Sequence, residues 1–99
     1  MTFRLLSIAE EDLAEATRFY ETQAAGLGHE FLDEFEAAVA RACQFPEGWR
    51  IISRRHRRCL FRRFPFAVLY TVDEGVLVVA GVMDLRMDPE RQRQRAIDT

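Results

Sequence analysis

Apolar residues recur at two different spacings along this chain, and the change of spacing divides it into a helical and a strand-forming part. Between residues 9 and 45 they return every three or four positions, which is the period of an amphipathic helix. From residue 49 to residue 83 they alternate or run continuously, which is typical of strands. A short alternating segment at residues 3–8 precedes the helical part and predicts a first strand.

The helical part predicts two helices, at residues 9–25 and 28–45. The first follows Ser7-Ile8-Ala9-Glu10, which has the spacing of a capping box between a serine hydroxyl and a glutamate. It should stop at Ala25-Gly26-Leu27-Gly28, because glycine readily adopts the left-handed conformation that ends a helix. Pro46 ends the second helix. A joint this short predicts an antiparallel pair of helices.

The strand-forming part contains three main predicted strands and a shorter segment at residues 49–53. Their expected bounds are residues 58–64, 66–72 and 76–83. Pro65 marks a bulge or a strand junction, since proline cannot donate to the sheet. Asp73-Glu74-Gly75 predicts a tight hairpin turn. The last strand is apolar throughout, which favours a central position covered on both faces.

The predicted order is β-α-α-β-β-β: an N-terminal strand, a helical hairpin and then three antiparallel strands. Elements grouped in this way indicate an α+β fold with the helix pair on one face of an antiparallel sheet. The residues expected to join the two layers are Phe35, Phe66, Val78 and Ala80. Ninety-nine residues fit one domain over 1–99. Its tail, 89–99, is polar, and Asp88-Pro89 can cap a last helical turn.

Charge is strongly segregated, although the net formal charge is only −2. Residues 1–47 hold three arginines and ten acids, residues 48–72 hold seven arginines and no acid, and the remainder holds four arginines and six acids. All 14 basic residues are arginine, whose planar guanidinium suits carboxylate or phosphate. The middle segment is therefore either a surface for RNA phosphates or an acidic partner, or a solvated hairpin whose arginines pair with the helical acids. The candidate partner-binding residues are Arg54, Arg55, Arg57, Arg58, Arg62 and Arg63.

Few other residues suggest chemistry. A strand over 58–64 would place Arg58 and Arg62 on one face, beside apolar groups. His56 lies among four arginines that disfavour its protonated form, so it is either a neutral base or a turn residue without a role. His29, at a helix start, is expected to be structural.

Neither cysteine shows a nucleophile motif, and both Cys43 and Cys59 are expected to be free thiols. Metal-ligand spacings, glycine-rich phosphate loops and nucleophile elbows are missing from the sequence, so no metal or cofactor is expected. Apolar runs fall far short of the roughly 20 residues that span a membrane. The N-terminus does not resemble a secretory signal.

Several segments, taken in order, resemble the RelE/ParE family of type II toxin–antitoxin toxins over roughly residues 3–90. They are Asp12-Leu13, Phe19-Tyr20-Glu21, Gly26-Leu27-Gly28-His29-Glu30-Phe31-Leu32, Arg57-Arg58-Cys59-Leu60, Arg63-Phe64-Pro65-Phe66, Leu69-Tyr70, Val82-Met83, Leu85-Arg86 and Asp88-Pro89. The resemblance implies the β-α-α-β-β-β order and a small cytoplasmic toxin that is neutralised by an antitoxin encoded beside it. The antitoxin of such a pair wraps an extended or helical segment around the toxin.

Two activities occur in that family. RelE-like members cleave messenger RNA in the ribosome, and ParE-like members inhibit DNA gyrase without being nucleases. The nuclease branch needs basic residues on the sheet, and the resemblance offers Arg58, Arg62 or Arg63, and Arg86 for those positions. In a nuclease, Arg58, Arg62 and Arg86 would orient phosphate and stabilise the charge that builds up during attack by a 2′-hydroxyl. The nuclease branch also needs a basic or aromatic group near the C-terminus, and no Tyr or Trp follows Tyr70.

This chain departs at two places from the pattern of the family that it resembles. Members of that family usually carry a histidine where Asp84 stands and an aromatic pair where Arg91-Gln92 stand. A carboxylate at position 84 repels phosphate and can pair with Arg86. The favoured expectation is therefore a toxin that acts by protein contact, as in ParE-like gyrase inhibition. The alternatives are a ribosome-dependent mRNA endoribonuclease and a non-toxic remnant that only binds its antitoxin.

Overall fold

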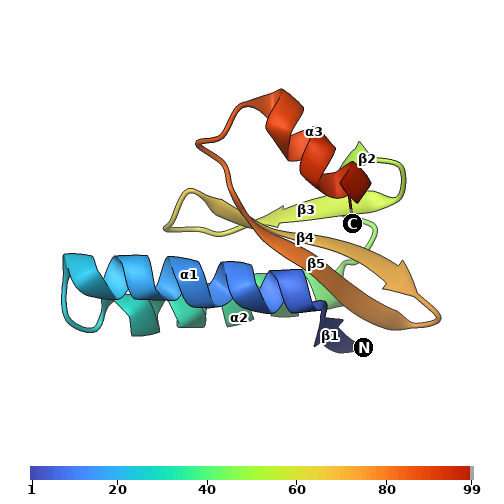
Figure 1. Ribbon diagram of the computed structural model, residues 1–99. Helices are drawn as coiled ribbons and strands as arrows, with labels where there is room; N and C mark the ends of the chain where they lie inside the picture. Colours follow the sequence, from blue (N-terminus) through green and yellow to red (C-terminus); the bar gives the residue numbers. More distant parts are fainter. Residues whose placement is uncertain (99) are drawn as a thin grey trace.

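The computed structural model describes residues 1–98, and it places a five-stranded sheet between a pair of helices and a third, C-terminal helix (Figure 1). The elements in chain order are β1 (Thr2–Leu5), α1 (Ser7–Gln23), α2 (Leu27–Gln44), β2 (Arg50–Ser53), β3 (His56–Leu60), β4 (Phe66–Asp73), β5 (Val76–Asp84) and α3 (Pro89–Asp98). The strands lie in the order β1-β5-β4-β3-β2. The expected α+β class is confirmed.

The sheet differs from the expected one in two respects. It is mixed, because β1 runs parallel to β5, whereas all other neighbours are antiparallel. Four strands rather than three follow the helices, since Arg50–Ser53 pairs with β3 as a full edge strand. Most of the chain separates β1 from β5, so no turn sets their relative direction and the local pattern does not encode it.

The two long helices occur where their periodicity predicted them, but the first begins without its capping box. Leu6, still extended, is the N-cap of α1, and no side chain caps this end. The Leu6 N–H donates to the carbonyl of Val79 at 3.0 Å, so the chain passes directly from the sheet into the helix. Ser7 is therefore already inside the first turn, and the predicted role for its hydroxyl was wrong.

The joint between the helices depends on two glycines and one glutamate. Gly26 has φ 87°, the left-handed conformation predicted for it. The Glu21 carboxylate accepts hydrogen bonds from the backbone N–H groups of Gly26 and Gly28, at 3.0 to 3.2 Å. A Cβ at position 28 would lie 2.9 Å from the carbonyl oxygen of Thr17, so glycine there permits the close approach of α1 and α2.

The predicted strand at 58–64 was too long, because the chain leaves the sheet after Leu60. Phe61 turns inward, and its ring lies 5.1 Å from that of Phe31 on α2. Its backbone N–H donates to the carbonyl of Phe66 at 2.9 Å, which closes a short loop around Pro65. Arg62 therefore lies outside the strand, and the prediction that it shares a face of the sheet with Arg58 was wrong. The turn after β4 is the predicted tight one, with positive φ at Glu74 and Gly75.

The main core lies between the helix pair and the sheet. Phe31 is fully buried at its centre, and the centroid of its ring lies 5.0 to 5.3 Å from the centroids of four neighbouring aromatic rings. These are Tyr20, Phe61, Phe64 and Phe66. Phe35 and Phe66 belong to this core, as expected.

Val78 and Ala80 do not join the helices to the sheet, contrary to expectation. The β4–β5 register shifts between Leu69 and Tyr70, which face Gly81 and Val79, so Ala80 is an extra residue in β5. Ala80 packs with Leu69 in a second, smaller cluster, and Val78 is buried outside both clusters.

The polar tail is more ordered than one capped turn. The Asp88 carboxylate accepts a hydrogen bond from the Arg91 N–H at 3.0 Å, and the helix that it caps continues to Asp98. Cys43 and Cys59 are free thiols, as expected. Within residues 1–98, no helix is both long and apolar enough to cross a membrane.

Candidate functional site

The fold distributes the arginine-rich segment over several places. Arg54 and Arg55 are exposed in the turn between β2 and β3. The Arg57 guanidinium donates to the carbonyl oxygens of Glu47 and Trp49, at 3.1 and 2.7 Å, and so holds the segment that joins α2 to β2. Arg57 therefore has a structural role in the fold.

Two further arginines lie beside α2. Arg63 forms an ion pair with Glu30 at 2.8 Å, as expected for arginines that pair with the helical acids. The backbone N–H groups of Arg62 and Arg63 both donate to the Glu34 carboxylate, at 3.0 and 2.7 Å. The loop after β3 is therefore fastened to α2 by carboxylates.

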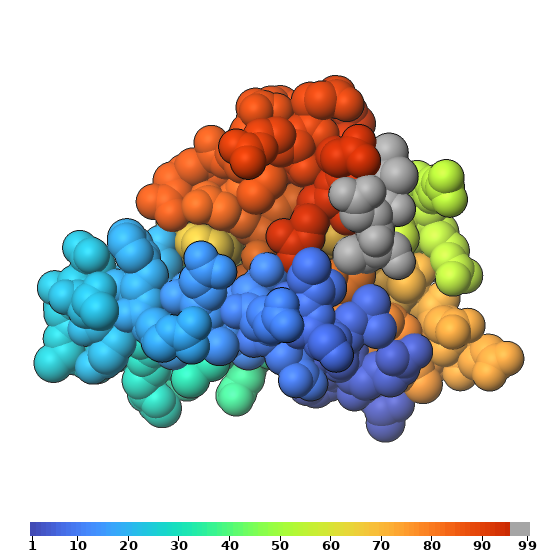
Figure 2. Space-filling model, viewed as in Figure 1, coloured from blue at the N-terminus to red at the C-terminus, as the bar shows by residue number. Residues whose placement is uncertain are grey.

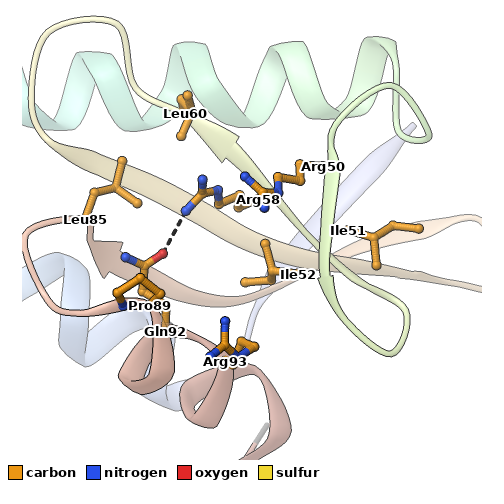
Figure 3. A pocket seen from close by; sticks show the side chains of 9 residues that line it. All are labelled: Arg50, Ile51, Ile52, Arg58, Leu60, Leu85, Pro89, Gln92 and Arg93. Atoms are coloured by element: carbon orange, nitrogen blue, oxygen red, sulfur yellow. Dashed lines mark hydrogen bonds between the residues drawn. The ribbon is translucent and has the colours of Figure 1, made fainter.

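Arg58 lies instead on the face of the sheet that α3 covers, in a cavity of about 570 Å³ between β2, β3 and α3 (Figure 3). We call it the arginine cavity, after Arg50, Arg58 and Arg93. Arg50 and Arg58 are direct partners in the β2–β3 register, and their side chains lie next to each other. The Arg58 guanidinium donates to the Gln92 side-chain oxygen at 2.7 Å. Gln92 thereby connects α3 to the sheet.

The remainder of the arginine cavity is mainly aliphatic. Its aliphatic lining residues are Ile51, Ile52, Leu60 and Leu85. Leu60 is 42% exposed, so the cavity opens onto apolar surface. Among the side chains that the structure describes, no acidic one lines it. Among the described residues neither Arg50 nor Arg58 has a carboxylate partner, whereas Arg93 pairs with Glu90. The cavity can therefore receive a carboxylate together with apolar groups.

Arg86 lies in a different cavity, of about 310 Å³, between α1 and the segment that follows β5. Figure 2 shows this face, with α1 in blue below the orange and red C-terminal segment. The Asp84 carboxylate accepts hydrogen bonds from Nε and Nη2 of Arg86, at 2.9 and 2.8 Å, so the predicted pairing of these residues is confirmed. This hydrogen bonding lowers the pKa of Asp84 and raises that of Arg86.

A second pair lines the same cavity. Asp12 on α1 accepts hydrogen bonds from the Val82 backbone N–H, at 3.0 Å, and from the Arg95 guanidinium. Burial raises the pKa of Asp12, although both of these contacts oppose the rise. With Glu15 included, three carboxylates and two guanidinium groups line the space, which we call the carboxylate cavity. Its charge is unfavourable for a phosphate group.

The three arginines considered for RNA cleavage do not share a cavity. Arg58 lines the arginine cavity and Arg86 the carboxylate cavity, and Arg62 lines neither. His56 is buried at the start of β3, and burial together with Arg55 and Arg54 lowers its pKa, the direction that its neighbours predicted. Its Nδ1 has no hydrogen-bond partner among the described residues. His29 is exposed on α2, 3.7 Å from the Asp33 carboxylate.

Two residues of the arginine cavity escaped sequence reasoning. Arg50 was counted in the charge of its segment, but it was not singled out. A regular hairpin turn at residues 54–55 would have placed it opposite Cys59, and only the register shift between Ile51 and Ser53 brings it opposite Arg58. Arg93 meets the sheet only through the packing of α3, which no local pattern encodes. Within residues 1–98, no three His, Cys, Asp or Glu side chains are grouped in a way that could hold a metal ion.

Comparison with known proteins identifies the family. The model of the ParE toxin of the type II toxin–antitoxin system, parDE, matches residues 3–89. Among solved structures, a chain of the chromosomal ParDE toxin–antitoxin system from P. aeruginosa has a similar fold, with a TM-score of 0.73 and 16% sequence identity. That match covers 87% of this chain and 97% of the other. A search of curated proteins returned no match. Since the family model spans nearly the whole domain, this chain belongs to the ParE toxin family of type II toxin–antitoxin systems.

Proposed function

We propose that this toxin acts in the cytoplasm by binding a protein target, DNA gyrase, and that it does not cleave RNA. A cognate antitoxin neutralises it. The observation that carries the proposal is the pairing of Arg86 with Asp84 through two hydrogen bonds. A guanidinium held in this way has its Nε and Nη2 donors engaged and its charge balanced by the carboxylate, so it is a poor ligand for a scissile phosphate.

The surroundings of Arg86 support the same conclusion. Asp12 and Glu15 add carboxylates to the carboxylate cavity. Cleavage by a 2′-hydroxyl needs donors aimed at developing negative charge, and carboxylates beside that charge oppose it. Arg58 and Arg62 lie elsewhere and do not supply the missing donors. Inhibition of gyrase by contact needs no proton transfer, so it is compatible with Asp84.

Two assays on the purified full chain test this proposal. In the first, ribosomes that are translating a defined mRNA are incubated with wild type, Asp84→His or Asp73→His, the last being the same change at the exposed end of β4. We expect no cleavage by wild type or Asp73→His. In the second, DNA supercoiling by gyrase is followed as toxin is added, and we expect inhibition that the antitoxin reverses.

The outcomes separate the three activities. Ribosome-dependent cleavage by wild type would contradict the proposal and identify an endoribonuclease. Cleavage only by Asp84→His would support it, because that variant frees Arg86 and supplies an imidazole. If wild type neither inhibits gyrase nor arrests growth when it is induced without antitoxin, the chain is a non-toxic remnant.

A further inference from the structure

We infer that the arginine cavity receives an acidic, aliphatic segment of the antitoxin, with one carboxylate placed across Arg50 and Arg58. This rests on the proposed function, which supplies the antitoxin as the partner. This binding site includes fewer arginines than the arginine-rich segment as a whole, because other arginines of that segment already form contacts within the fold. Arg57 holds two backbone carbonyls and Arg63 holds Glu30.

The charge of the cavity selects a carboxylate. Arg50 and Arg58 face the same space from neighbouring strands, and within the described residues neither forms an ion pair. Two adjacent guanidinium groups repel each other, and a bound carboxylate relieves the repulsion while accepting hydrogen bonds from both. Arg58 now donates to the neutral Gln92 amide, so a carboxylate offers it a stronger, charge-assisted bond.

The remaining lining selects a peptide rather than a nucleic acid. Leu60 exposes apolar surface at the cavity, and Ile52 and Leu85 extend it. Single-stranded RNA is typically bound by stacking of its bases on aromatic rings, and among the side chains that the structure describes no aromatic one lines this cavity. Aliphatic side chains that flank a carboxylate would bury the apolar part of the lining, which a phosphodiester chain cannot do.

The test measures binding of the antitoxin encoded beside this chain to the full toxin by calorimetry. Arg50→Glu and Arg58→Glu are each expected to raise Kd at least tenfold, equivalent to about 1.4 kcal/mol. The matched control is Arg4→Glu, the same charge change on β1 at the opposite edge of the sheet, which should change Kd less than about threefold. Circular dichroism melting of each variant verifies the fold.

Two further variants separate the cavity from a general charge effect. Arg58→Lys keeps the charge but loses the planar fork, and it should weaken binding severalfold. Leu60→Gln keeps every charge, removes aliphatic surface at an exposed position, and should also weaken binding. Single-stranded RNA is titrated in parallel against wild type and Arg50→Glu.

Each other result contradicts the inference. If Arg4→Glu weakens antitoxin binding as much as Arg50→Glu does, only the overall charge matters. If the cavity variants bind antitoxin as wild type does, the antitoxin binds elsewhere on the toxin, while the proposed function stands. If Arg50→Glu loses RNA but keeps antitoxin, the cavity is a nucleic-acid site. Failure of wild type to bind antitoxin would contradict both the inference and the proposed function.

Discussion

Asp84 and Arg86, two residues apart at the end of β5, form a closed pair in which the carboxylate also accepts the Arg86 backbone N–H at 2.9 Å. The Arg86 guanidinium in addition lies 5.8 Å from the centre of the Phe66 ring. The side chain is therefore held on two sides, by a carboxylate and by an aromatic face.

The first prediction concerns the ionisation of this pair. We expect carbon NMR to place the pKa of Asp84 below its usual value near 4, and Arg86→Gln to return it toward that value, because Arg86 is the main cause of the shift. A depressed pKa means that any stabilisation by Asp84 is complete above about pH 4 and is lost as pH falls through the folded value. The pair is partly exposed, so this amounts to about 1 kcal/mol or less. An unchanged titration in Arg86→Gln would contradict the assignment.

The second prediction concerns Asp12, which connects α1 to β5 and α3. Asp12→Ala removes the acceptor of the part-buried Val82 N–H and should cost about 1–3 kcal/mol in the free energy of unfolding by urea. Asp12→Asn keeps an oxygen for Val82 and should lose less. Glu15→Ala, one turn away and exposed, is the control and should stay within about 0.5 kcal/mol. Equal losses for Asp12→Ala and Glu15→Ala would show that the contact does not matter.

The third prediction tests the core with two phenylalanines, Phe35 within α2 and Phe45 at its C-cap. Phe35 is only 4% exposed, so Phe35→Ala should destabilise the fold by about 3–5 kcal/mol. Phe45 is 62% exposed, so Phe45→Ala should change stability by no more than about 0.5 kcal/mol. Urea unfolding of both variants measures the difference. A Phe35→Ala midpoint equal to that of wild type would place Phe35 outside the core.

The fourth prediction concerns alkaline pH. Tyr70 is fully buried, its hydroxyl donates to the Pro46 carbonyl at 2.6 Å, and burial raises its pKa to about 12. The unfolded phenol ionises near pH 10, so folding stability is complete below that pH and falls as pH rises toward 12, by on the order of 2 kcal/mol.

Tyr70→Phe provides the comparison. At neutral pH it should be less stable than wild type by about 1 kcal/mol, because the Pro46 carbonyl loses its donor. Above about pH 10 the difference should shrink, since phenylalanine does not ionise. Urea unfolding of both proteins across this range measures it. A constant difference up to about pH 12 would show that Tyr70 ionises equally in the folded and unfolded states.

Local features of the sequence were sufficient for the two helices, the left-handed Gly26, the hairpin turn at residues 73–75 and the α+β class. Each depends on the period or the backbone freedom of a few consecutive residues. The pairing of Asp84 with Arg86 was predictable for the same reason, because two residues separated by one position meet whatever the rest of the chain does. The membership of the ParE toxin family likewise followed from motifs in order along the chain.

Only the tertiary structure determined where the arginine side chains lie. The strand stops at Leu60 because Phe61 buries its ring against Phe31 on another element, and that removes Arg62 from the face of Arg58. The extra residue Ala80 in β5 similarly changes which face of the sheet the side chains that follow it occupy. Arg50, Arg58 and Arg93 come together only when β2 pairs with β3 and α3 packs over them. Side chains alternate locally, but the points where strands end, bulge and pair are set by packing between distant segments, and so is the grouping of these arginines.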